Sequence, residues 1–445
     1  MSDKNDGIND NELPEDERHL PELVPSHRGR MVSIRGLVER IIEEFEIEHG
    51  ENESEAVQES TSEIERRKLL RSVADYIFSV ESVHLELKEQ AQIIARSYSE
   101  IFGYGALDTL FSDKNVTTIT LEGARKAAVR YQPGTALIPL EPLFEDTPHM
   151  RKILKRLLKD AGAQLRDDVP IIETGLTIEG RRVCLTIAAS PFVSEIAVDI
   201  RVHPKELPTL DMLVESGVLT QQVRQILESI VKSGYGFIIV GDTESGKTTL
   251  LSVLAQLLPS PEGILAIERA SELALPDGAE RLMATWPVDD DEWFSFGERI
   301  KQAIEKKPQT LILDEVRTDE PESIAPLLHE PDMPRQIWSF RGASSASRIR
   351  SALGMIARMS DHTQPESMVF NLYERLPFII RIKRRKGYLQ VLEIAEWQFP
   401  DNYKEINDLV YADYISLMEM GWEICEPTGK RPKHDLGLPE DFWDM

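Results

Sequence analysis

Apolar residues near the start of the chain recur at helical spacing and then stop. They predict a short amphipathic helix, because its apolar residues share one face: Ile34, Leu37, Ile41, Ile42 and Phe45. The polar run HGENESEAVQESTSE then predicts a solvated linker, and a second helical stretch is expected from about 64 to 102. We therefore expect a helical extension with an acidic linker over 31–102, preceded at 1–30 by a disordered tail of acidic and polar residues.

The pattern changes after Gly103 to short β-like runs separated by turn residues. These runs are VTTITL, AAVRY, GLTIEG, RRVCLTIA and EIAVDIR, and one helical segment, RKILKRLLKDAGAQL, interrupts them. Strands mixed with a helix in this way predict a smaller α+β domain over 103–203. A proline-containing run without apolar period then indicates an interdomain linker at 204–210.

From 211 to 399, predicted helices alternate with short buried strands. The strand runs are FIIV, GILAIE, TLILDE, IWSF, FIIRI and YLQVLEI. Such alternation favours an α/β domain with a mostly parallel sheet and helices on both faces. The remaining residues, 400–445, are expected to form a C-terminal extension with a helix over DLVYADYISLMEM.

Composition narrows the class of protein only in part. A length of 445 residues with 41% hydrophobic residues is enough for two or three folded domains. A formal net charge of −26 disfavours direct binding to nucleic acid or to anionic lipid, because both are themselves negative. Two cysteines cannot build a four-cysteine zinc site. The apolar runs fall short of the roughly 18 residues that a spanning helix needs, so we expect a cytoplasmic protein without a transmembrane segment.

One motif predicts nucleotide chemistry. The run GDTESGKTT satisfies GxxxxGK[ST], lies directly after the strand FIIV and precedes the helical run TTLLSVLAQLL. Backbone N–H groups of such a loop cradle phosphate, Lys247 supplies positive charge to it, and the Thr248 hydroxyl can bind Mg²⁺. The predicted nucleotide-binding residues are Gly241, Asp242, Thr243, Glu244, Ser245, Gly246, Lys247, Thr248 and Thr249. Glu244 is unusual here, since a carboxylate that points inward would weaken binding of an anion.

A second strand, TLILDE, ends in two carboxylates. We assign Asp314 to Mg²⁺ and Glu315 to polarising the attacking water, as expected where a strand end delivers acids to a phosphate site. A solvated acidic turn is the alternative, and the phosphate-loop motif upstream argues against it. A third strand, GILAIE, ends at Glu268 with Glu272 close behind; a single glutamate there is as often a surface residue as a catalytic one.

Taken together, these motifs resemble the type II/IV secretion ATPase superfamily, the ring motors of secretion systems and type IV pili. The resemblance covers about 103–397 and also includes GYGALDTLFSD, PTLDMLVESGVLT, LAIERASELALP and KKPQTLILDEVRTDEPESI. Within the superfamily the arrangement is most similar to the CpaF-like branch, which serves tight-adherence (Tad) pili, and to related archaeal motors.

The resemblance implies a fold, a cofactor and partners. It implies an N-domain joined to a RecA-like C-domain, a homo-hexamer, ATP with Mg²⁺ between the two domains, and contact with an inner-membrane platform protein. It also implies that Arg182 and Arg201 approach the phosphates, which would neutralise transition-state charge. For either arginine alone, an ordinary surface position on a strand is equally compatible with the sequence. Glu268, in the segment that resembles the family's acidic box, is implied to be catalytic.

The sequence also departs from the family pattern at several positions. Arg269 stands where an aspartate is usual, Asp314 stands where a glycine is usual, and Glu244 lies in the phosphate loop. The family's Thr-x-His stretch aligns with Ser339-Phe340-Arg341, and an arginine cannot shuttle a proton near neutral pH.

Two hypotheses remain open from the sequence. The first is an ATPase whose hydrolysis drives pilus assembly or protein secretion, supported by Lys247, Thr248 and Glu315. The second is a nucleotide-binding regulatory or assembly subunit with weak or absent hydrolysis, motivated by Glu244, Arg269 and Arg341.

Overall fold

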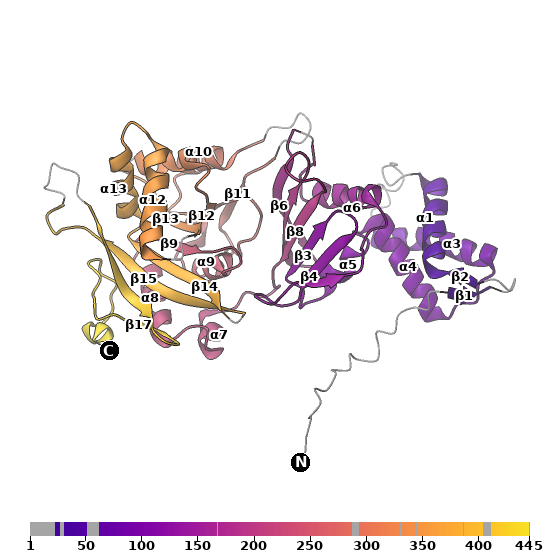
Figure 1. Ribbon diagram of the computed structural model, residues 1–445, viewed down its shortest axis with the longest axis horizontal. Coiled ribbons are helices and arrows are strands. Elements are labelled where there is room, and N and C mark those ends of the chain that lie inside the picture. The colour runs from indigo at the N-terminus through magenta and orange to yellow at the C-terminus, as the bar shows by residue number, and fades with distance from the viewer. Residues whose placement is uncertain are drawn as a thin grey trace, which may run out of the picture. The chain divides into compact units, whose positions relative to one another are not determined.

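A computed structural model describes the chain in two compact units, 1–110 and 111–445 (Figure 1). Within them it describes residues 23–26, 31–50, 62–166, 168–286, 293–329, 332–342, 345–385, 387–403 and 411–444. Most of the predicted tail and of the predicted linker, at 1–22, 27–30 and 51–61, lies outside the described residues. Among the helices within these ranges, none combines the length and the apolar character needed to span a membrane.

The first unit is a small helical bundle. Its elements are β1 (Leu23–Pro25), β2 (Met31–Ser33), α1 (Ile34–His49), α3 (Glu63–Glu81) and α4 (Leu87–Phe102); the boundary between the units falls within α5 (Leu107–Ser112). The predicted apolar face of α1 is buried against α3 and α4, since Leu37, Ile41 and Phe45 share one core with Leu70 and Ile93.

Two predictions for this region were wrong in detail. Leu23–Pro25 lies in the predicted disordered tail but pairs as a strand with β2, and Val24 is buried in the bundle core. The single helix expected from about 64 to 102 is two helices, because the chain turns at Ser82 in a left-handed conformation. A reciprocal capping box then starts the next helix: the Glu89 carboxylate accepts a hydrogen bond from the Glu86 N–H.

The second unit begins with an antiparallel six-stranded sheet in the order β5-β4-β3-β8-β7-β6. Its elements are β3 (Thr118–Glu122), β4 (Lys126–Arg130), β5 (Ile138–Leu140), α6 (Thr147–Asp160), β6 (Ile171–Ile178), β7 (Arg181–Ala188) and β8 (Ala197–Val202). Helix α6 buries its apolar face, and Arg181 ties β7 to the start of the domain by donating to the carbonyls of Phe111, Asp113 and Val116. The smaller α+β domain predicted from the sequence is thus present.

A nine-stranded sheet follows in the order β11-β10-β12-β13-β9-β14-β15-β16-β17, parallel from β11 to β14 and antiparallel beyond. Its strands are β9 (Phe237–Gly241), β10 (Ile264–Glu268), β11 (Glu280–Met283), β12 (Thr310–Val316), β13 (Arg335–Arg341), β14 (Phe378–Arg385), β15 (Tyr388–Gln398), β16 (Asp413–Met420) and β17 (Cys425–Pro427). One strand, β13, separates the strand before the phosphate loop from the strand that ends in two acids.

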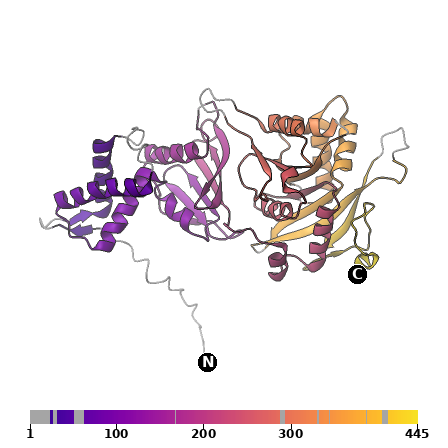
Figure 2. The same cartoon turned by 180° about the vertical axis from the view of Figure 1, so that it is seen from behind.

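Helices cover both faces of this sheet (Figures 1 and 2). They are α7 (Leu210–Glu215), α8 (Gln221–Lys232), α9 (Lys247–Ala255), α10 (Phe296–Lys306), α11 (Ala325–His329), α12 (Ala346–Ser360) and α13 (Pro365–Arg375), with short 3₁₀ turns at Pro261–Gly263, Pro321–Ile324 and Glu440–Trp443.

The apolar strands supply a core to each face because successive side chains point to opposite sides. In β9, Ile239 packs in the core formed with α8 and α9, whereas Ile238 packs in the core formed with α10, α12 and α13. This arrangement confirms the predicted fold class: an α/β, RecA-like C-terminal domain, preceded by a smaller α+β domain and a helical extension.

The predicted C-terminal helix is wrong. Asp413–Met420 forms β16, which pairs with β15 and extends the sheet, and β17 adds to its edge. The main-chain groups along the free side of β15 offer hydrogen bonds to a further strand, and the aromatic and β-branched residues of DYISLMEM fit a sheet surface. Tyr414 packs edge-on against the buried Trp397, and Leu417 is fully buried in the core.

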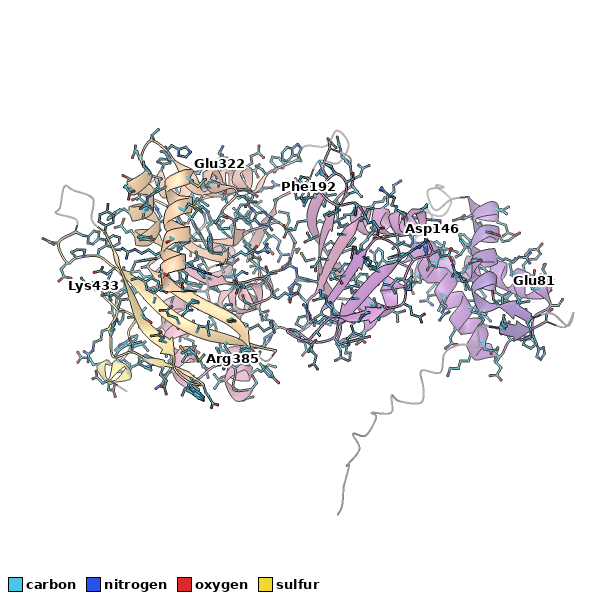
Figure 3. The ribbon with its side chains drawn as sticks, in the orientation of Figure 1. Glu81, Asp146, Phe192, Glu322, Arg385 and Lys433 are labelled. Carbon is cyan, nitrogen blue, oxygen red and sulfur yellow. The ribbon has the colours of Figure 1, made fainter. Side chains whose placement is uncertain are left out.

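A buried carboxylate fixes the final segment of the chain. Glu396 on β15 has no exposed surface, and it accepts hydrogen bonds from the main-chain N–H groups of Lys433 and His434, each at 2.9 Å. The His434 ring lies 2.7 Å from the same carboxylate and packs against Tyr235 and Phe378. Lys433 also reaches Asp401, and Figure 3 labels it in the C-terminal part of the chain.

We predict that Glu396→Ala destabilises the second unit by about 3 kcal/mol, because it leaves buried donors without their acceptor. Urea unfolding followed by tryptophan fluorescence measures the change, and limited proteolysis should show earlier cleavage near 430. Asp444→Asn is the matched control, since Asp444 pairs with Arg431 at the exposed surface. Equal stability of Glu396→Ala and the control would contradict the prediction.

Candidate nucleotide site

The predicted phosphate loop joins the buried strand β9 to α9 in a way that leaves space for an anion. Gly246 has a φ of +98°, which a glycine adopts without strain, and it directly precedes the helix N-terminus. A side chain at Gly241 would lie 2.5 Å from the Ser245 hydroxyl and 2.8 Å from the Ile382 carbonyl oxygen. The glycines are therefore required by the close turn, and the N–H groups at the start of α9 present partial positive charge to the loop.

Lys247 is held between the loop and the strand that ends in two acids. Its side chain is 6% exposed, its ammonium donates to the Asp242 carbonyl oxygen at 3.0 Å, and it lies 3.2 Å from a carboxylate oxygen of Glu315. Glu315 was assigned to the attacking water and Lys247 to phosphate, and the structure brings these two side chains together.

Asp314 lies at the same strand end, in the cavity lining, and is almost completely buried. The Ser339 hydroxyl donates to its carboxylate at 2.6 Å, and Asp314 is 8% exposed. Burial, followed by the negative charge of Glu272, raises the pKa of Asp314 to about 7. Ser339 lies on β13, the strand between β12 and the phosphate-loop strand β9. The bond therefore holds the Asp314 carboxylate of β12 against β13.

The structure separates the two glutamates of the third strand. Glu268 is fully buried, pairs with Arg281 at 2.7 Å and accepts from the Leu273 N–H; burial raises its pKa to about 8 against the pull of Arg281. Glu272, by contrast, accepts from the Thr248 hydroxyl at 3.3 Å and contacts Arg201 at 3.1 Å. Glu272 therefore faces the phosphate loop, and the catalytic assignment of Glu268 stays a prediction.

Glu272 is the more strongly ionised of the two. Burial opposes its charge, but Arg201 and His203 outweigh that effect and hold the pKa of Glu272 well below its usual range. The sequence analysis noted Glu272 but did not assign it to the nucleotide site. The feature that could have indicated its role is its position four residues after the end of the strand.

The two predicted arginines come from the six-stranded sheet and both meet Glu272. Arg182 on β7 donates to the Glu272 carbonyl oxygen at 2.9 Å, whereas Arg201 on β8 faces its carboxylate. A third arginine, Arg317, follows the two acids of β12 and donates to Glu173 on β6 at 2.5 Å. Arginines and glutamates of both sheets thus meet beside the phosphate loop.

These groups line a cavity of about 900 Å³. A volume near the upper end of the usual range for ligand pockets, roughly 300–1,000 Å³, is sufficient for a nucleotide. The lining includes most of the predicted residues: Thr243, Glu244, Ser245, Gly246, Lys247, Thr248, Thr249, Asp314, Glu315 and Arg201, together with Glu272, Arg317, Arg130 and Arg384. Thr248 and Asp314 are the residues that would hold Mg²⁺, and their oxygen chemistry fits a hard cation.

The structure shows where two departures from the family pattern lie, and it gives one of them, Arg269, a structural role. Arg269 donates to the Glu315 carbonyl oxygen at 2.6 Å and to the Glu320 carboxylate at 2.9 Å, and its guanidinium lies 4.0 Å from the Phe296 ring centre. It therefore supports the backbone of the acidic strand end. Arg341, at the end of β13, is an exposed residue of the cavity lining.

The raised pKa of Asp314 predicts a pH dependence of stability. The folded state keeps the proton up to about pH 7, whereas the unfolded chain releases it near the usual aspartate value, so this group's contribution to stability falls as pH rises between those values. Asp314→Asn cannot titrate but can still accept from Ser339. Urea unfolding in Mg²⁺-free buffer from pH 4.5 to 8 should therefore give a flatter profile for Asp314→Asn than for the parent, while the exposed Asp277→Asn should match the parent. Parallel profiles for Asp314→Asn and the parent would refute this expectation.

Comparison with known proteins gives this arrangement a context. Residues 144–326 match the family described as "Type II/IV secretion system protein". A conjugal transfer protein of Mycobacterium tuberculosis is 25% identical over 225 residues, or 49% of this chain and 63% of the relative. A conjugal transfer protein TrbB of Sinorhizobium fredii is 27% identical over 228 residues, or 50% of this chain and 66% of the relative.

Solved structures are similar at lower identity. The Legionella pneumophila ATPase DotB is 15% identical with a TM-score of 0.47, and the match covers 69% of this chain and 82% of DotB. The chain spans just under two thirds of the length of the two conjugal transfer relatives. The segment matched to this family, 144–326, contains the phosphate loop and both acidic strand ends, and the match confirms over that segment the resemblance to the type II/IV secretion ATPase superfamily.

Proposed function

We propose that this chain is a ring-forming ATPase that uses ATP binding and hydrolysis to drive pilus assembly or protein secretion through an inner-membrane platform. The observation that carries the proposal is the meeting of Lys247, Thr248, Glu315 and Arg201 around one cavity. Phosphoryl transfer needs little covalent help from a protein and depends mainly on positioned charge, which these residues supply.

Each residue has a defined part in the proposed reaction. Thr248 and Asp314 would hold Mg²⁺, which neutralises charge on the phosphates when bound. Lys247 would bind the phosphate chain, and Glu315, which lies within 4 Å of both Lys247 and Arg317, would orient the attacking water. Arg201 and Arg182 come from the other sheet and would add positive charge as the reaction proceeds.

The proposal includes assembly and location. A homo-hexamer, a cytoplasmic position at the inner membrane and a platform partner are typical of the motors that the sequence resembles, and the Tad-type branch is the one we favour. Two of the relatives that this chain matches are named as conjugal transfer proteins, and that process is not part of the proposal. Direct DNA contact is not part of it, because the formal net charge of −26 opposes binding of a polyanion.

The second candidate is a nucleotide-binding subunit of such a machine with weak or absent hydrolysis. Two observations favour it: Glu244 places a carboxylate in the phosphate loop, and Arg341 occupies the position where the family pattern has a histidine. Neither replaces Lys247 or Glu315, and loss of turnover through changes around an otherwise retained lysine and carboxylate is the less expected outcome.

Steady-state phosphate release with Mg-ATP separates the two candidates. The purified chain should turn over, and Lys247→Ala and Glu315→Gln should each lower the rate by about 100-fold or more, because they remove positioned charge and the group that orients water. Size-exclusion chromatography of the same samples should show a ring-sized species. Asp319→Asn, which changes another carboxylate of the cavity lining outside the proposed roles, is the control. Binding of ATP without turnover in the parent would favour the second candidate.

A further inference from the structure

The cavity carries an ion pair that the family pattern does not account for. The guanidinium of Arg130, on β4 of the six-stranded sheet, lies 2.5 Å from both carboxylate oxygens of Glu244 in the phosphate loop. Arg130 is only 15% exposed and Glu244 34%, so the pair is shielded from solvent more than an ordinary surface pair. Both residues belong to the cavity lining.

The position of Glu244 is held on several sides. Its φ is +59°, a conformation that residues other than glycine adopt only with strain, and the Arg384 guanidinium donates to its carbonyl oxygen at 2.7 Å. Arg384 also donates to the Gly387 carbonyl oxygen at 2.8 Å, which links the loop to the turn between β14 and β15. These contacts fix the main chain at Glu244, and Arg130 holds its carboxylate.

Arg130 is fixed from its own side as well. Its Nε donates to the Thr135 carbonyl oxygen at 2.8 Å, which leaves Nη1 to donate to Glu244. The same turn brings Gly134 so close to Gly387 that a side chain at Gly134 would lie 2.9 Å from the Gly387 Cα. The six-stranded sheet thus touches the phosphate loop and the β14–β15 turn at one place.

The Glu244 carboxylate affects how well the phosphate loop attracts an anion. A loop that presents N–H groups and a helix N-terminus favours anions, and a carboxylate in it competes with phosphate for the same positive surroundings. Arg130 balances that charge together with Arg384, which also interacts with Glu244, whereas Asp199 adds negative charge beside the pair. Removing Arg130 alone would leave Arg384 to balance both Glu244 and Asp199, so the phosphate loop would become more negative.

We propose that Arg130 and Glu244 are positioning residues that form a latch between the six-stranded sheet and the phosphate loop, and that the latch sets the affinity of the site for a nucleoside triphosphate. The Glu244 carboxylate pairs with Arg130 and repels phosphate. Arg130 reduces this repulsion by balancing the negative charge, and it also holds the phosphate loop in place. The sheet that carries Arg130 thereby controls entry of the nucleotide into the loop. This inference rests on the proposed function, because it assumes that the cavity takes a nucleotide.

Isothermal titration of the full chain with Mg-ATP and Mg-ADP tests the latch. Glu244→Gln keeps the shape of the side chain and removes its charge, so it should bind Mg-ATP about three- to tenfold more tightly than the parent. Arg130→Gln should bind about tenfold more weakly in the parent, but in the Glu244→Gln background it should change affinity by less than about threefold, because Arg130 then has no carboxylate to balance. The effects should be smaller for Mg-ADP, which carries less charge.

The ion pair between Glu122 and Lys126 supplies a matched control, because it joins two exposed residues at 2.9 Å at the other end of the hairpin that carries Arg130. Glu122→Gln should leave Mg-ATP affinity unchanged. Equal affinities of Glu244→Gln, Arg130→Gln and Glu122→Gln would overturn the latch while leaving the nucleotide site intact, and so would effects of Glu244→Gln and Arg130→Gln that simply add in the double variant.

The two proposals can still be distinguished if the parent chain fails to bind Mg-ATP. Binding by Glu244→Gln alone, lost again on Lys247→Ala in that background, would support the latch in its strongest form. Failure of both the parent and Glu244→Gln to bind Mg-ATP would contradict the proposed function together with the latch.

Discussion

The side chain of Lys247 is only 6% exposed, so its positive charge must be paired with a negative group. The site around Lys247 depends on that pairing. The Glu315 carboxylate balances this charge at 3.2 Å, and Glu272 and Glu244 pair in the same way with Arg201 and Arg130. Each of these cations is a group that phosphate would also attract. A phosphate chain that binds these cations would therefore have to replace the carboxylates as their partners.

The pairs also connect the two sheets of the second unit. Glu173, Arg201 and Arg130 belong to the six-stranded sheet, and their partners Arg317, Glu272 and Glu244 belong to the larger domain. A change in the charge of the cavity therefore acts on contacts between the sheets. In the proposed motor this is the physical route from the chemical state of the nucleotide to a movement of one sheet relative to the other, since differential contacts in two states are what a ligand can act on.

The parts of this account that were predictable from the sequence are those set by local pattern. The buried strand FIIV, the phosphate loop and the strand ending at Glu315 follow from adjacent residues, and the structure has them as β9, the turn into α9 and β12. Asp413–Met420 was predicted as a helix because its partner, the free side of β15, is not visible in its own sequence. The latch shows the same limit, because Arg130 and Glu244 are 114 residues apart and only the fold brings them together.

A crystal structure of the full chain with Mg²⁺ and a non-hydrolysable ATP analogue would test the central claim most directly. The account predicts that the triphosphate lies along the phosphate loop, that Lys247 turns from Glu315 to the phosphate oxygens, and that Thr248 binds the metal. An analogue bound elsewhere, or bound in the cavity with the pairs of Lys247 and Arg201 to their carboxylates intact, would contradict the claim that phosphate replaces these carboxylates.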